Sequence, residues 1–147
     1  MESPRTRIVE DPYGRVLRLQ EEAQGCEVQA HRAILEARKF EARAARLALK
    51  EKKMRAKATA RIARSQSIGD RVRAMFHEEK AIDKEVKMEK SHQLTFEAES
   101  LRLRAKAIDS QAAQLRIAAR GKMAESVHLR ADAKRLYLEA EAAKANV

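Results

Sequence analysis

Residues 94–147 read LTFEAESLRLRAKAIDSQAAQLRIAARGKMAESVHLRADAKRLYLEAEAAKANV. Starting at Leu94, steps that alternate between four and three residues meet an apolar side chain at fourteen of sixteen positions. Large and small residues alternate almost strictly along this line, and the two polar exceptions are Lys122 and Ser126. An apolar seam with this spacing is typical of a coiled coil. The sixteen positions are 94, 98, 101, 105, 108, 112, 115, 119, 122, 126, 129, 133, 136, 140, 143 and 147.

A seam of the same spacing occurs in the first half of the chain. Twelve of its thirteen positions are apolar, and Glu51 is the exception. Residues such as Ile82 and Val86 continue its register, so we expect the register to change within 87–93. The thirteen positions are 16, 19, 23, 26, 30, 33, 37, 40, 44, 47, 51, 54 and 58.

The composition excludes several other classes of protein. The chain has 147 residues, 37% charged and only 3% aromatic, so a thick globular core cannot be assembled. Two prolines and four glycines are too few for the turns of a β-sandwich or barrel. The single Cys26 excludes an intramolecular disulfide framework and fits a reducing compartment. Without an apolar run near the ~20 residues that cross a bilayer, or a secretory signal at the start, we expect a cytoplasmic, including cytoskeletal, location.

Local signals predict where the helices begin and end. Residues 1–10 carry no apolar period and are expected to form a flexible arm. Asp11 and Pro12 are an N-cap acceptor and a proline at the first helical position, so the first helix is predicted over 11–66. Gly69 favours a turn at 67–70, followed by a second helix over 71–147. A break within 87–93 or at Gly121 is the alternative for the second helix.

Folding the chain at the turn predicts an all-α, elongated antiparallel helical hairpin, a coiled coil with an alanine-rich seam. The residue numbers of facing side chains then add to about 138, which places Leu19 opposite Ala119. Sums of 131 or 145 would align the two seams equally well. Only a sum of 138 centres the turn on Gly69. In this register the residues 38–64, with net charge +9, face 74–100, with net charge −3. Opposite flanking charges favour this pairing.

The chain contains no recognisable catalytic constellation. Its four histidines are isolated, with no second histidine or cysteine three or four residues away. There is no glycine-rich phosphate loop, nucleophile elbow or dinucleotide fingerprint. Cys26 falls on the seam, where a small buried side chain is expected. We therefore expect neither an enzyme nor a cofactor, metal ion or small-molecule substrate.

One feature of the sequence does suggest a function. The segment 38–64, termed the basic strip, carries eleven Lys or Arg side chains against two acidic ones. It is either a solvated flank of the coiled coil or a docking surface for an acidic partner. Interleaved aromatic residues that would stack on bases are missing, which disfavours recognition of single-stranded nucleic acid. The cations are Arg38, Lys39, Arg43, Arg46, Lys50, Lys52, Lys53, Arg55, Lys57, Arg61 and Arg64.

Three functions are consistent with these observations. The first is a structural, non-enzymatic subunit of a large assembly, cytoskeletal or similar, with the basic strip on an acidic surface such as a filament. The second is an accessory protein that binds RNA or DNA. The third is an export-stalk or adaptor coiled coil, because the length and hairpin resemble the stalk proteins of flagellar and type III export; the likeness in residues is confined to 16–19, VLRL. Partner chains are expected because off-seam apolar residues need cover: Ile34, Leu35, Leu49, Ile62, Phe76, Leu103, Ile117, Val127, Tyr137 and Leu138.

Overall fold

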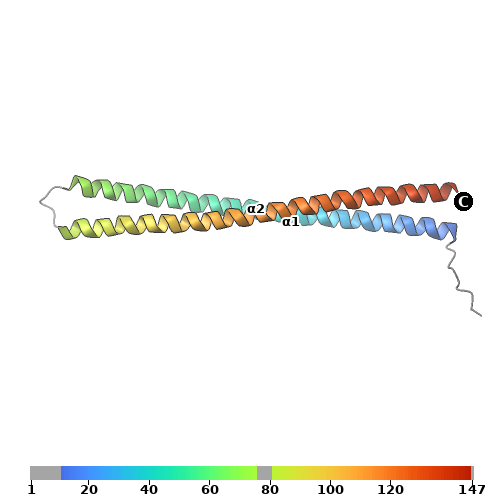
Figure 1. Cartoon of the computed structure of the whole chain (residues 1–147), viewed down its shortest axis with the longest axis horizontal. Helices are drawn as coiled ribbons and strands as arrows, with labels where there is room; N and C mark the ends of the chain where they lie inside the picture. Colours follow the sequence, from blue (N-terminus) through green and yellow to red (C-terminus); the bar gives the residue numbers. More distant parts are fainter. Residues whose placement is uncertain (1–10, 76–80, 147) are drawn as a thin grey trace, which may run out of the picture. The chain divides into compact units, whose positions relative to one another are not determined.

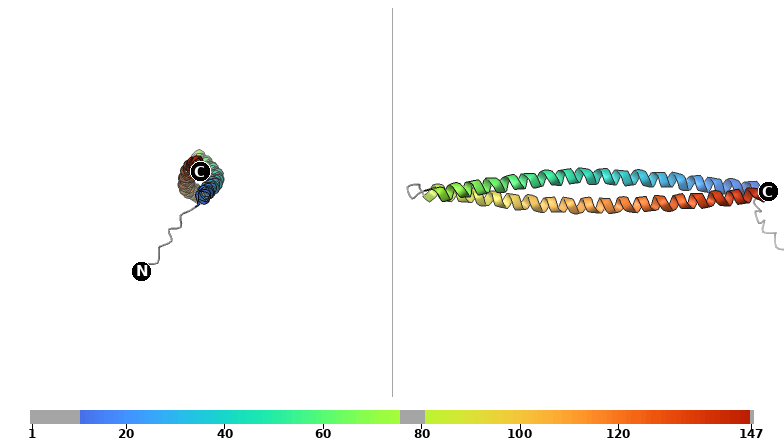
Figure 2. Two further views of the ribbon diagram at one scale, coloured as in Figure 1. Left: turned by 90° about the vertical axis from the view of Figure 1, so that its right-hand side faces the viewer. Right: turned by 90° about the horizontal axis from the view of Figure 1, so that it is seen from above.

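The computed structural model describes residues 11–75 and 81–146, and over these residues it contains two long α-helices and no strand. Helix α1 spans Pro12–Ala74 and helix α2 spans Ala81–Ala145. The first half of α1 lies beside the second half of α2, and the second half of α1 beside the first half of α2 (Figure 1). The view from above shows the same pairing (Figure 2). The predicted all-α antiparallel hairpin is confirmed.

The helix pair divides into two compact units. Unit 1 combines Met1–Phe40 with Ile117–Val147, and unit 2 comprises Glu41–Arg116. Each unit therefore contains one segment of α1 packed against one segment of α2. The predicted arm at 1–10 and the off-seam Phe76 lie outside the described residues.

Helix α1 begins where the sequence predicts. The backbone N–H of Tyr13 donates to the Asp11 carboxylate at 3.4 Å, and the N–H of Arg15 donates to the Asp11 carbonyl at 3.0 Å. The Asp11 carboxylate thus satisfies one of the donors that a helix leaves unpaired at its start, and the Asp11 carbonyl accepts the first intrahelical hydrogen bond. Pro12, which has no N–H, occupies the first helical position.

The two predicted seams form the interface within each unit. All thirteen positions from 16 to 58 and all fifteen from 94 to 143 are buried or half-buried, while position 147 lies outside the described residues. In unit 1, Val16, Leu19 and Ala140 form a buried cluster against which Leu136 and Ala143 pack. Most of the fully buried residues are alanines, so the two backbones approach closely and the larger side chains fill the space between them.

The predicted turn at 67–70 is wrong. Helix α1 continues through Gly69 to Ala74, and no glycine among the described residues has a positive φ. Glycine inside a helix costs roughly 1 kcal/mol relative to alanine, and the additional turns half-bury Ile68 and Val72. This packing outweighs the local preference of glycine for a helix end. The connection therefore falls between Ala74 and Ala81.

Helix α2 is continuous, so neither of the alternative breaks occurs. It runs without interruption through 87–93 and through Gly121. Ile82 and Val86, which were expected on the seam, are 70% and 59% exposed. The seam of α2 instead continues from Leu94 back to the buried Ser91. The change of register lies between the two helices and requires no slip inside α2.

The register of the hairpin differs from the predicted one by about three heptads. Leu19 packs with Ala140, not with Ala119, and the numbers of this pair add to 159 instead of 138. In unit 2, Ser65 bonds to Ser91, a pair whose numbers add to 156. A shift by whole heptads preserves the seams and the matching of large with small residues. Periodicity therefore fits both registers equally well.

A cluster of buried hydroxyl groups distinguishes the two registers. The Ser65 Oγ donates to the Ser91 carbonyl at 2.9 Å, and the Ser91 Oγ donates to the Ser65 carbonyl at 3.1 Å. The Ser65 Oγ also lies 2.8 Å from the Ser91 Oγ and 2.9 Å from the Thr95 Oγ1. In the predicted register Ser91 would face Leu47, and a buried polar group without a partner costs about 1–3 kcal/mol. The hydroxyl cluster therefore favours the observed register.

A disulfide across the hydroxyl cluster tests the register. We expect Ser65→Cys with Ser91→Cys, in a Cys26→Ala background, to form a bond within one chain, because the two side chains already meet. Non-reducing electrophoresis and intact mass measure the product. The matched pair Ala30→Cys with Ile108→Cys, which faces in the predicted register, should stay reduced; its intrachain oxidation would contradict the observed register.

Two alanines of α1 test how closely the seam is packed. Ala58 is fully buried, and Ala56 is exposed on the same helix. We expect Ala58→Leu to lower the free energy of unfolding by about 1–3 kcal/mol through overpacking. Ala56→Leu is the control, because it makes the same change in helix propensity at an open position. Denaturant unfolding followed by circular dichroism measures both, and equal stabilities would mean that the seam is loosely packed.

Candidate functional site

The basic strip lies on the solvent side of α1. Arg61 is half-buried and the other ten cations are exposed. They are exposed because nearly all fall between the seam positions; Arg43, Lys50, Lys57 and Arg64, for example, recur every seven residues beside the seam. Arg38 and Lys39 belong to unit 1, and the nine cations from Arg43 to Arg64 belong to unit 2.

Few of these cations are neutralised within the chain. The Arg55 Nε lies 2.7 Å from a carboxylate oxygen of Glu51, and the Arg61 Nε lies 3.2 Å from one of Glu97. Exposed ion pairs of this kind contribute at most about 1 kcal/mol. The other nine cations of the basic strip form no ion pair with any residue of 11–75 or 81–146.

The observed register overturns the expected charge pairing. In unit 2 the segment 43–64, net +8, lies opposite about 95–116, whose four basic and three acidic residues net +1. Of the acidic residues in 81–100, Glu97 and Glu99 lie opposite the basic strip, and Glu97 pairs with Arg61. Asp83, Glu85 and Glu89 lie beyond its end. The predicted neutralisation is therefore wrong, because it depended on the turn at Gly69. Apart from the pairs of Arg55 and Arg61, the positive charge of the strip has no acidic counterpart among the described residues.

Cations of α2 extend the basic surface. One shallow groove of unit 2 is lined by Arg61, Glu97 and Arg104 beside the exposed Phe96. A second is lined by Arg55 and Glu99, with Arg102 and Lys106 of α2 on either side of Leu103, so cations outnumber acids in both grooves. The sequence shows the charge of these α2 residues, but the predicted register, in which facing numbers add to 138, places 102–106 opposite 32–36 and not opposite the middle of the basic strip. Their part in the surface is visible only once the helices are paired.

Unit 1 is electrostatically different. The Lys122 Nζ lies 3.0 Å from a carboxylate oxygen of Glu36 on the other helix and 3.2 Å from one of Glu125. The hydrogen bond to Glu36, followed by that to Glu125, raises the pKa of Lys122 above its ordinary value. The one charged residue on the seam of α2 is thus paired across the helices. Unit 1 neutralises its seam cation, in contrast to the strip in unit 2.

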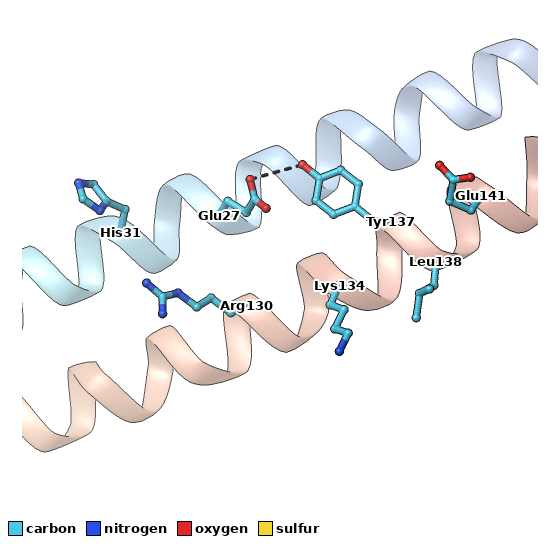
Figure 3. Close-up of a pocket in the computed structure, with 7 residues that line it drawn as sticks. All are labelled: Glu27, His31, Arg130, Lys134, Tyr137, Leu138 and Glu141. Carbon is cyan, nitrogen blue, oxygen red and sulfur yellow. Dashed lines mark hydrogen bonds between the residues drawn. The ribbon is translucent and has the colours of Figure 1, made fainter.

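Unit 1 has a shallow groove whose lining includes Glu27, His31 and Tyr137. Tyr137 donates a hydrogen bond of 3.4 Å to Glu27, and burial, together with the negative charge of Glu27, raises the pKa of this tyrosine. His31 also lines the groove, whereas Lys134 and Leu138 point away from α1 (Figure 3). No hydrogen bond joins His31 to a carboxylate among the described residues. No group of three or more potential metal ligands occurs within 11–75 and 81–146.

Comparison of the chain with protein-family models, with curated proteins and with solved structures found no match. Neither described helix contains a stretch that is apolar enough to cross a membrane. The fold and the surface define the class of the protein as an all-α helical hairpin with a concentrated basic face on one unit.

Salt provides a test of the uncompensated charge. In unit 2 a segment of net charge +8 faces one of net charge +1, so the two segments repel each other. Salt screens this repulsion, and the Debye length falls to about 3 Å at 1 M. We therefore expect the melting temperature to rise as sodium chloride is increased from 0.05 to about 1 M. The variant with Lys50, Lys52, Lys53 and Lys57 all changed to Gln should show a smaller rise. Thermal unfolding at each salt concentration measures the effect. A melting temperature that falls with salt in the native chain would indicate opposite charges facing each other.

Proposed function

We propose that the chain is a non-enzymatic structural subunit of a large assembly, and that it docks there through its basic strip on an acidic surface. The observation that carries the proposal is the charge of unit 2: nine cations of the strip, all but Arg61 exposed, lie opposite a segment that is itself slightly positive. A partner with negative charge would relieve this repulsion and release bound counterions.

The paired helices support a role in positioning other chains. A helical hairpin offers long exposed faces and only shallow grooves, whereas catalytic sites are usually concave pockets. Exposed apolar residues on both helices, among them Leu49, Leu103, Ile117 and Leu138, offer contacts to further chains. An assembly in the cytoplasm, of cytoskeletal type, fits these features.

RNA or DNA is the second candidate partner. The same excess of positive charge favours it, because phosphate backbones are bound chiefly by Lys and Arg through counterion release. Phe40, the aromatic residue within the strip, is half-buried on the seam, and Phe96 of α2 is exposed beside Arg61. Proteins that bind single strands stack several bases on several aromatic side chains, so contact here would be made chiefly to the phosphate backbone.

Reversal of charge in the basic strip tests the proposed function. We expect Lys50→Glu, Lys52→Glu, Lys53→Glu and Lys57→Glu together to abolish recruitment of the chain into its assembly, with little change in helicity because both residue types favour helices. Sedimentation of cell extracts measures whether the tagged chain travels in a large complex or near its own mass of 16.7 kDa.

The control reverses four exposed cations of unit 1: Arg120, Arg130, Lys134 and Arg135. This variant should remain in the complex. If the control leaves the complex and the strip variant does not, the basic strip is not the docking surface. Release of the native chain by nuclease would instead favour the nucleic-acid candidate.

A further inference from the structure

A row of small and apolar side chains runs through the middle of the basic strip on α1. Ala42, Leu49, Ala56 and Ala63 recur every seven residues, all four are exposed, and all belong to unit 2. Leu49 is 62% exposed. The row lies on the face of α1 opposite to the buried seam, because it falls midway between the seam positions. We term these four residues the outer row.

The outer row shares its small side chains with the internal interface. On the buried seam, alanines line much of the contact between the two helices. The outer row reads Ala, Leu, Ala, Ala, with one position in each heptad where the seam has two. A second helix can therefore approach this face closely, with Leu49 as the projecting side chain.

Cations surround the projecting leucine. Residues three or four positions apart are neighbours on a helix surface, so Arg46, Lys52 and Lys53 lie around Leu49. All three are exposed, and none forms an ion pair within the described part of the chain. A partner that covers Leu49 must therefore bring negative charge beside its own apolar contact.

Charge and shape together select among the possible occupants. A second copy that docked through the same face would bring another unit 2, of net charge +8, against the first. A nucleic-acid backbone makes no use of an apolar row at heptad spacing. Insertion into a membrane surface requires large apolar residues along the face, whereas three of the four residues here are alanines.

We propose that the outer row docks one α-helix of a partner protein, whose own apolar stripe is flanked by Glu or Asp. The proposal rests on the proposed function, because it names the acidic surface on which the basic strip docks. Leu49 supplies the apolar contact, Ala42, Ala56 and Ala63 allow the close approach, and Arg46, Lys52 and Lys53 pair with the acidic flanks.

Two synthetic peptides test the proposal with the full chain. The first has four heptads, with leucine at both apolar positions of each and glutamate at the flanking positions; the second is a scramble of the same composition. Both carry the same charge, but only the first forms an apolar helical stripe. We expect the heptad peptide to bind at least tenfold more tightly than the scramble, measured by isothermal titration calorimetry at 0.15 M salt.

A matched pair of variants assigns the contact. Leu49→Gln should remove the difference between the two peptides, because it deletes the apolar contact and keeps the charge. Leu103→Gln is the control, since Leu103 is exposed to a similar extent on α2 of the same unit. Glutamine is a good helix former, and both sites are open, so circular dichroism should show unchanged helicity.

The other outcomes overturn the inference in distinguishable ways. The two peptides could instead bind equally well and lose binding when the four strip lysines are reversed. That result would be consistent with the proposed function but would mean that the strip binds its partner by charge alone. Tighter binding of a homopolymeric RNA or of phosphatidylserine vesicles, unaffected by Leu49→Gln, would assign the strip to nucleic acid or to a membrane. Self-association lost in Leu49→Gln would assign the row to a second copy. If the chain with the four strip lysines reversed still entered the assembly, the proposed function itself would be contradicted.

Discussion

The close approach of two helices across an alanine-rich seam is the constraint on which the structure depends. Alanine contributes little buried area, so stability requires the larger residues of one helix to fill the space left by alanines on the other. Leu19 against Ala140 in unit 1 is an example. An interface of this kind leaves the opposite face of each helix open. The exposed cations and apolar residues are a direct consequence.

The polar groups within the seam add specificity to this packing. Ser65 and Ser91 exchange hydrogen bonds across unit 2, and Lys122 reaches Glu36 across unit 1. Each of these contacts between the helices forms in one alignment, whereas apolar contacts repeat at every heptad. The alignment in turn decides which charges face each other. In unit 2 it places 43–64 against a segment without surplus acid, and this leaves the basic strip available to a partner.

Much of the fold was predictable because helical periodicity is a local property. The seam positions, the start of α1 at Asp11 and the antiparallel pairing all follow from spacing, capping chemistry and the few turn residues of the chain. The position of the connection was not predictable from Gly69. Its preference for a helix end is worth roughly 1 kcal/mol, which is less than the packing that the last turns of α1 gain. Arg71 and Arg73 in the last turn of α1, and Asp83 in the first turn of α2, are favourable helix-end charges that marked the true ends.

The sequence by itself determined that the chain forms helices, which of their faces meet, and that one segment of 27 residues carries net charge +9. These properties depend on residue identity and on spacing along a single helix. Only the tertiary structure decided the alignment of the two helices, because a heptad pattern is unchanged by a shift of seven residues and the buried hydroxyl groups distinguish one shift from another. Ile82 and Val86, which the sequence predicts on the seam, are exposed in this alignment. The alignment also places the cations of α2 beside the basic strip, because the pairing of the helices decides which residues of α1 they lie next to.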